Sequence, residues 1–353
     1  VAYLYLGCIY LYGYGIKKDF DKAKKYFDLG CNINDPISNL LLGNYFSMTG
    51  NHSEAIKLYE RSANYNNSDA LFNLGNIYLS ANYYNSDPSK ALYYFEKSAN
   101  LNNSFAFLQI GNIYFNGSGV KQSYEKAKYY YEKSAELRNS DAILNIGILY
   151  SFGLGVEKDF TKAKYYYEQS TLFNNPSAYF HLGACYLLDK NDKLNQFKSL
   201  QCFLISAKHN NPSALFYLGY FYSNDDIYGF DIDKSIEYFT KCTTIENDLI
   251  LNYDDKSIYS TVTAYKYNQY LRRSMNDLGL LYLIEKNDYE KAINLIKNAA
   301  FPEYPCAQNN YGLLLEFNSN DIAKAEHFYE RSTEHNFALG YFNLGRLNEE
   351  KGK

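Results

Sequence analysis

Cysteine and histidine are the residues of this chain with the greatest capacity for metal binding or catalysis, and their spacing favours neither. The six cysteines contain no Cys-x-x-Cys pair and are Cys8, Cys31, Cys185, Cys202, Cys242 and Cys306. Such spacing fits neither a zinc site nor a disulfide framework. The five histidines form no His-Glu-x-x-His motif, and no nucleophile motif is present. The sequence therefore predicts free thiols, no metal site, no cofactor and no enzymatic activity.

Three Gly-x-Gly pairs are the next candidates, because glycine lets backbone N–H groups approach a phosphate. They are Gly13-x-Gly15, Gly117-x-Gly119 and Gly153-x-Gly155. Each follows a helical pattern rather than a strand, and the third glycine of a dinucleotide-binding motif is missing. We therefore expect these glycines to supply positive φ in turns between helices.

A third set of residues offers hydrogen bonds. Amide or imidazole side chains lie one residue after, or two residues before, a recurring glycine: Asn44, Asn76 and Asn112 after it, and Asn73, Gln109, Asn145 and His181 before it. Residues three apart share a helical face, so Asn73 and Asn76 are expected side by side. A carboxamide has a donor and an acceptor and can match a peptide backbone. The alternative is that an Asn-rich chain places asparagine wherever it is tolerated.

The glycines belong to an internal repeat that sets the elements of the fold. They recur at positions 7, 43, 75, 111, 147, 183, 219, 279, 312 and 345, mostly in steps of 32 to 36 residues. A small residue lies five positions before each glycine, and an aromatic residue usually lies three positions after it. Small side chains at these offsets allow a second helix to approach closely. This pattern predicts the first helix of each repeat.

A second apolar period predicts the second helix. It pairs a small residue with a large apolar residue four positions later, as in Ala127 with Tyr131 and Ala163 with Tyr167. Asn-rich turns follow, and asparagine tolerates the left-handed conformation that ends a helix. No segment shows strand alternation. The predicted fold is all-α, an elongated right-handed α-α superhelix (solenoid) of about nine antiparallel helix pairs plus a terminal helix.

Three units carry the fullest form of the repeat, at residues 10–23, 114–127 and 150–163. The last reads Tyr150-Ser-Phe-Gly-Leu-Gly-Val-Glu-Lys-Asp-Phe-Thr-Lys-Ala163. Gly-x-Gly-Val followed by Asp-Phe-x-Lys-Ala resembles the Sel-1-like repeat family, a relative of tetratricopeptide repeats. The resemblance implies protein binding, and in tetratricopeptide repeats the residue equivalent to Asn76 contacts peptides. Units without the Gly-x-Gly loop, near Ser38 and after Gly279, resemble tetratricopeptide repeats more closely.

Two irregularities define the expected domain organisation. The step from Gly219 to Gly279 is 60 residues, which exceeds a 36-residue unit by 60 − 36 = 24. We therefore expect repeats over 1–245, an insertion or lengthened helix over 246–268, and further repeats of the same solenoid over 269–353. Limited proteolysis is expected to cut first in the insertion. Neither end reads as the polar capping unit of a complete solenoid, so we expect a fragment of a longer protein.

The composition and charge of the chain indicate which kinds of partner and location to expect. Lys and Arg number 35 against 39 Asp and Glu, a formal charge of −4, so no cationic track for nucleic acid is expected. Mean hydropathy is −0.44, and no apolar run reaches the roughly 18 residues of a span, so no membrane insertion is expected in this segment. No secretory signal is visible, which predicts a cytoplasmic location. The endoplasmic reticulum lumen is the alternative if an upstream signal exists.

Every regular feature serves the stacking of helices, and we predict a protein–protein interaction scaffold or adaptor. Partner peptides would bind along the concave face, with the rings of Tyr217 and Tyr220 burying apolar ligand side chains. Two alternatives remain open. One is the regulatory repeat region of a larger signalling enzyme such as a protein kinase. The other is an adaptor subunit of an endoplasmic-reticulum ubiquitin-ligase complex, as some Sel-1-like proteins are. An RNA-binding solenoid is disfavoured by the acidic charge.

Overall fold

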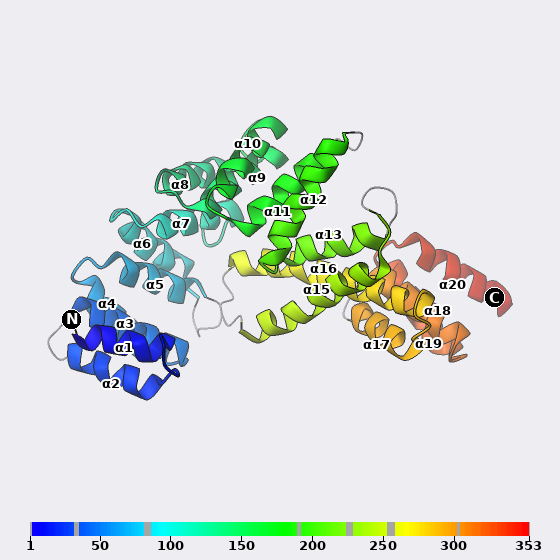
Figure 1. Cartoon of the computed structure of the whole chain (residues 1–353), viewed down its shortest axis with the longest axis horizontal. Coiled ribbons are helices and arrows are strands. Elements are labelled where there is room, and N and C mark those ends of the chain that lie inside the picture. Colours follow the sequence, from blue (N-terminus) through cyan, green and yellow to red (C-terminus); the bar gives the residue numbers. More distant parts are fainter. Residues whose placement is uncertain are drawn as a thin grey trace. The chain divides into compact units, whose positions relative to one another are not determined.

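The computed structural model describes residues 2–31, 35–80, 86–188, 192–223, 229–252, 258–301 and 304–352 (Figure 1). Side chains are described in these ranges except at residues 2, 245–252 and 258–268. Within the described residues every regular element is a helix, and 19 helices are present. The predicted all-α fold of nine helix pairs and a terminal helix is confirmed.

The first five pairs are α1 (Ala2–Tyr12) with α2 (Phe20–Cys31), α3 (Pro36–Met48) with α4 (His52–Ala63), α5 (Ser68–Leu79) with α6 (Pro88–Ala99), α7 (Ser104–Asn116) with α8 (Tyr124–Glu136), and α9 (Ser140–Phe152) with α10 (Phe160–Thr171). Four pairs and the terminal helix follow: α11 (Pro176–Leu187) with α12 (Lys193–Lys208), α13 (Pro212–Ser223) with α15 (Ile232–Asn252), α16 (Ile258–Ile284) with α17 (Tyr289–Ala300), α18 (Pro305–Phe317) with α19 (Ile322–Glu334), and then α20 (Ala338–Glu350).

The chain divides into two compact units. The first consists mainly of Val1–Asn175, and the second of Pro176–Tyr253 with Val262–Lys353. In the first unit, the second helix of each pair packs against the first helix of the next pair, from α2 on α3 to α8 on α9. The same arrangement joins α12 to α13, α17 to α18 and α19 to α20 in the second unit. Each unit is therefore a stack of repeats in chain order.

The segment 246–268, predicted as an insertion or lengthened helix, contains the end of one long helix and the beginning of another. Helix α15 extends to Asn252, and α16 begins at Ile258. Residues 253–257 lie outside the described residues. The expectation that a protease cuts first in this segment stays a prediction. Among the described residues, no helix combines the length and the apolar character needed to cross a membrane.

At the recurring glycine, the first helix of a pair lies directly against the large side chain of the second helix. A Cβ added to Gly147 would lie 2.6 Å from the ring of Tyr167, which is buried between α9 and α10. An added Cβ would lie 2.3 to 3.2 Å from the large side chain of the second helix in the other pairs as well. These pairs of residues are Gly7 and Phe27, Gly43 and Tyr59, Gly75 and Phe95, Gly111 and Tyr131, Gly183 and Phe203, Gly219 and Phe239, Gly279 and Ile296, and Gly312 and Tyr329. The glycine in each first helix thus makes room for the large residue of the second helix.

The turn within a pair explains the rest of the repeat motif. Gly153 ends α9 with φ of 70°, and Gly155 has φ of 64°, which confirms the turn interpretation of the Gly-x-Gly pairs. Asp159 then caps α10 by accepting a hydrogen bond from the backbone N–H of Lys162 at 2.9 Å. The Lys162 ammonium lies 5.3 Å from the ring centroid of Tyr150, so the Lys of the motif covers the aromatic residue of the first helix.

Runs of three tyrosines distribute their rings between core and surface. In α10, Tyr167 is buried, and Tyr166 stacks on Tyr150 with ring centroids 5.6 Å apart and planes 6° apart. Tyr165 is exposed and contacts Tyr166 edge-on. The aromatic composition therefore reflects one ring in the core and a stacked pair beside it.

Between repeats, asparagine takes the predicted left-handed conformation, with φ of 57° at Asn66.

Candidate functional site

The predicted amide residues of the first unit lie on the first helices of their pairs, but they differ in what they contact. Asn44 of α3 is half-buried, and its Oδ1 accepts two hydrogen bonds. One comes from the hydroxyl of Tyr59 in α4 at 2.8 Å, and the other from Nδ2 of Asn73 in α5 at 2.9 Å. Asn44 therefore joins three helices of two successive repeats.

Asn112 and Asn145 are enclosed, each with 4% of its surface exposed. Oδ1 of Asn112 accepts a hydrogen bond from the hydroxyl of Tyr131 at 2.9 Å. Its Nδ2 donates to Oε1 of Gln109 at 3.3 Å. A buried phenol without an acceptor costs free energy, so Asn112 has a role in the stability of its own repeat.

Asn76 occupies the same position after its glycine, yet its amide is available. It is half-buried, and its side-chain amide makes no hydrogen bond within residues 35–80 and 86–188. The reason lies across the pair: the ring that covers Gly75 is Phe95, which has no hydroxyl to donate. Asn73 uses its Nδ2, and Gln109 its Oε1, for the bonds described above. Oδ1 of Asn73, the amide of Asn76 and Nε2 of Gln109 thus remain to bind a ligand.

The three predicted residues of the second unit lie on α11 and α13. His181 is half-buried, with its ring centroid 5.3 Å from that of Phe180. Tyr217 is half-buried and stacks on Phe203 at 5.7 Å, with the planes 4° apart. Tyr220 is 47% exposed. Tyr217 therefore belongs to the margin of the core, and Tyr220 to the surface.

A second series of buried polar contacts was not predicted. In the second unit, Nδ2 of Asn310 donates to Oδ1 of Asn276 at 3.0 Å, joining α18 to α16. Glu316, with 7% of its surface exposed, accepts a hydrogen bond from the Tyr329 hydroxyl at 2.6 Å. The Arg346 guanidinium donates to both of its carboxylate oxygens at 2.7 Å. The signal was present in the sequence, since Asn310 has the same offset from Gly312 as Asn73 has from Gly75.

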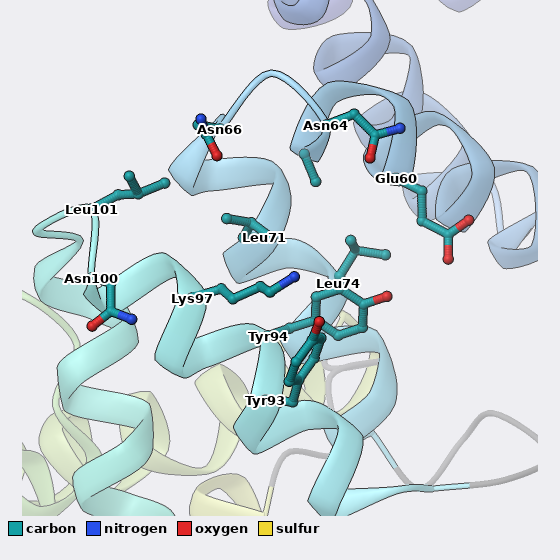
Figure 2. Close-up of a pocket in the computed structure, with 11 residues that line it drawn as sticks. Glu60, Asn64, Asn66, Leu71, Leu74, Tyr93, Tyr94, Lys97, Asn100 and Leu101 are labelled. Atoms are coloured by element: carbon teal, nitrogen blue, oxygen red, sulfur yellow. The ribbon is translucent and has the colours of Figure 1, made fainter.

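A cavity of about 510 Å³ opens on the first unit between the second helices α4 and α6, above α5 (Figure 2). Leu71 and Leu74 of α5 are both buried in its wall. The other lining residues form the sides and rim: Glu60, Ala63, Asn64, Asn66, Tyr93, Tyr94, Lys97, Asn100 and Leu101. Figure 2 shows the Lys97 side chain extending across the cavity. Sequence reasoning did not identify this site.

The reactive side chains stay apart in the described residues. All six cysteines are free thiols, and burial raises the pKa of Cys31 and of Cys202 to about 11. No group of three or more His, Cys, Asp or Glu side chains gathers within the described ranges in a way that would hold a metal ion. The described residues therefore present to solvent hydrogen-bonding amides, tyrosine rings and a cavity lined by both polar and apolar side chains.

The family model of the Sel1 repeat matches this chain nine times, at residues 1–35, 36–66, 68–103, 108–139, 140–171, 176–211, 212–241, 272–300 and 307–337. These segments correspond to the nine helix pairs described above. The chain belongs to the Sel1 repeat family, whose solenoid is typically a non-catalytic, protein-binding fold.

Solved structures share the fold. A Sel1 repeat protein from Oxalobacter formigenes has 27% identity and a TM-score of 0.60, with 69% of this chain and 99% of that chain covered. The protein c5321, a protective antigen of uropathogenic Escherichia coli with an SLR fold, has 21% identity and a TM-score of 0.53, with 99% and 80% covered. No curated protein matches the sequence.

Proposed function

We propose that this protein is an interaction scaffold that binds an extended partner peptide along its first helices. The observation that carries the proposal is the amide of Asn76, which is half-buried beside Asn73 and makes no internal hydrogen bond among the described residues. A polar group held at the surface without a partner retains its full capacity to bind a ligand. The family, whose members bind proteins, supports the same conclusion.

The peptide backbone would alternate between the donors and acceptors of α5 and α7. Oδ1 of Asn73 accepts from a peptide N–H, Nε2 of Gln109 donates to a carbonyl, and Asn76 does both. Each bond contributes only about 0.5–1.5 kcal/mol net, so affinity requires several in series. Asn44 supports this row through its bond to Asn73, and in the second unit His181, Tyr217 and Tyr220 are proposed as further contacts.

The test begins with a pull-down from the native cell extract and identification of the bound protein by mass spectrometry. The peptide segment bound is then titrated against Asn76→Ala/Gln109→Ala. We expect a loss of at least about tenfold in affinity, because three hydrogen bonds to the peptide are removed, two from Asn76 and one from Gln109. Asn298→Ala, an exposed amide on the second helix α17, is the matched control and should leave affinity unchanged. Equal affinity of the double variant and the control would contradict the proposal.

A further inference from the structure

The recurring glycine of α20, Gly345, is the one exposed member of a series of ten. The other nine are buried, and each lies against the large side chain of the second helix in its pair. A Cβ added to Gly345 would have no atom within 4 Å. Helix α20, red in Figure 1, packs on α19, but within the described residues no second helix covers its glycine.

An apolar ring lies exposed beside this glycine. Phe342 precedes Gly345 by three residues, so the two share one face of α20. Phe342 is 66% exposed, although the residues at the same offset in four other first helices are buried: Leu40, Leu108, Leu144 and Phe216. An open glycine with a large apolar side chain next to it is the surface that a second helix covers in the other pairs.

A hydrogen-bond acceptor lies on the same face. Glu349 has the same offset from Gly345 as Glu316 has from Gly312. The ring that covers Gly312 is Tyr329, whose hydroxyl donates to Glu316 at 2.6 Å. Glu349 is exposed, and its carboxylate has no hydrogen bond or ion pair in the described parts of the chain. It is therefore positioned to accept from the hydroxyl of a tyrosine that covers Gly345.

We propose that this face of α20 binds a helix of a partner protein in which a small residue is followed four positions later by tyrosine. This is the pattern of Ala325 and Tyr329 in α19. The partner's tyrosine ring covers Gly345 and contacts Phe342, and its hydroxyl donates to Glu349.

A second copy of this chain does not offer such a helix. The large residue of each of its nine second helices is buried in its own pair, with at most 2% of its surface exposed. The proposed site belongs to the second unit and shares no residue with the amides of α5 and α7. Its failure would therefore leave the proposed function of those amides intact.

Fluorescence anisotropy with a labelled peptide tests the proposal on the full chain. The peptide has the sequence of residues 321–337, and a hydrocarbon link between positions 323 and 330, both exposed in α19, keeps it helical. Two control peptides carry phenylalanine or alanine in place of the tyrosine. We expect the tyrosine peptide to bind about tenfold more tightly than the phenylalanine peptide, and the alanine peptide to bind most weakly. Absence of binding up to about 1 mM, or equal binding of the tyrosine and alanine peptides, would overturn the proposal.

Variants of the protein locate the binding. Gly345→Leu should weaken the tyrosine peptide at least about tenfold, because leucine occupies the place of the ring. Glu349→Ala should weaken it about tenfold and leave the phenylalanine peptide within about twofold. The matched controls Asn298→Leu and Glu290→Ala, at exposed positions of α17, should change neither, and circular dichroism verifies that all four variants fold. If Gly345→Leu binds like the parent protein, the peptide has replaced α19 in its own pair and the proposal is wrong.

Discussion

At the residue scale, the asparagine that directly follows the recurring glycine has one of two roles, stability or ligand binding. The aromatic ring opposite it on the second helix determines which. Asn112 and Asn44 accept hydrogen bonds from the hydroxyls of Tyr131 and Tyr59. Asn76 lies opposite Phe95 and has no such bond. Since a buried hydroxyl is costly without a partner, the first two asparagines stabilise the fold, and only the third is wholly available for a ligand.

Asn112→Ala should lower the free energy of unfolding by about 1–3 kcal/mol, because the Tyr131 hydroxyl loses its acceptor in a buried site. In the double variant with Tyr131→Phe the loss should be smaller than the sum of the two single losses, by about 1 kcal/mol. Chemical denaturation measures both. Asn76→Ala is the control and should change stability by less than about 0.5 kcal/mol. Equal losses at positions 76 and 112 would show that the hydroxyl bond has no net value.

Cys202 should react slowly with iodoacetamide in the native protein at pH 8. Burial raises its pKa from 9.0 to about 11, and two pKa units reduce the reactive thiolate about 100-fold. Mass spectrometry of alkylated peptides should find Cys202 modified at least about 100-fold more slowly in the native state than in urea. After denaturation without reductant all six thiols should be modified, and reproducible bridged peptides would instead indicate an oxidising compartment.

At the element scale, the glycine within the first helix of a pair and the Asp that starts most second helices have separate roles. Gly147 lets the Tyr167 ring approach the backbone of α9. Asp159 starts α10, and its backbone N–H also donates to the carbonyl of Tyr150 at 2.9 Å, which closes the turn. The repeat motif therefore encodes the distance between the two helices and the place where the second begins.

Gly147→Ala should destabilise the protein by roughly 1–3 kcal/mol, because the new Cβ would lie 2.6 Å from the Tyr167 ring. Gly345→Ala should stabilise it by about 0.5–1 kcal/mol, since no atom lies within 4 Å of that Cβ and alanine is the better helix former. Thermal melts of the two variants compare the same substitution at the same repeat position. A loss at Gly345 as large as at Gly147 would exclude ring contact as the cause.

The capping aspartates should make stability fall in acid. The backbone N–H of Lys162 holds the pKa of Asp159 below its usual value, and that of Lys234 does the same for Asp231. A lowered folded-state pKa stabilises the fold above the unfolded value, and this contribution is lost as the pH falls through the folded value. The melting temperature should therefore drop between about pH 5 and pH 3. Asp159→Asn keeps a capping oxygen without the charge, and its drop should be smaller; an unchanged drop would contradict this assignment.

At the scale of the whole molecule, the chain is two stacks whose contacts are mostly between successive helices. The first unit is formed mainly by Val1–Asn175, and its helices pack on their chain neighbours. In such repeats stability is nearly the sum of the pairs and their interfaces. The interactions that maintain the first five pairs are therefore mainly internal to them.

A fragment of residues 1–175 should fold by itself. Circular dichroism should show helical structure, and heating should give a cooperative transition, because all five pairs keep their neighbours. The fragment 1–157 is the control: it ends before α10 and leaves Gly147 without the Tyr167 ring, so it should melt at a lower temperature. A disordered 1–175 fragment would show that the first unit depends on the second.

The sequence by itself determined the fold class, the number of pairs and most turns. The glycine period, the small residue with a large one four positions later, and the Gly-x-Gly pairs are local patterns, and each acts through backbone conformation or one helical face. Spacing also placed the amides on the first helices. It could not separate Asn76 from Asn112, because both have the same offset from a glycine.

Only the tertiary structure decided which amides are engaged and which are available. Asn112 accepts its hydrogen bond from the hydroxyl of Tyr131, 19 residues away on the next helix. Asn44 accepts one from the amide of Asn73, 29 residues away in the next repeat. The cavity beside Lys97 likewise depends on three helices, because its lining residues come from α4, α5 and α6. A local pattern specifies the face on which a side chain lies, but hydrogen bonds and cavities form between faces, and their partners are set by packing.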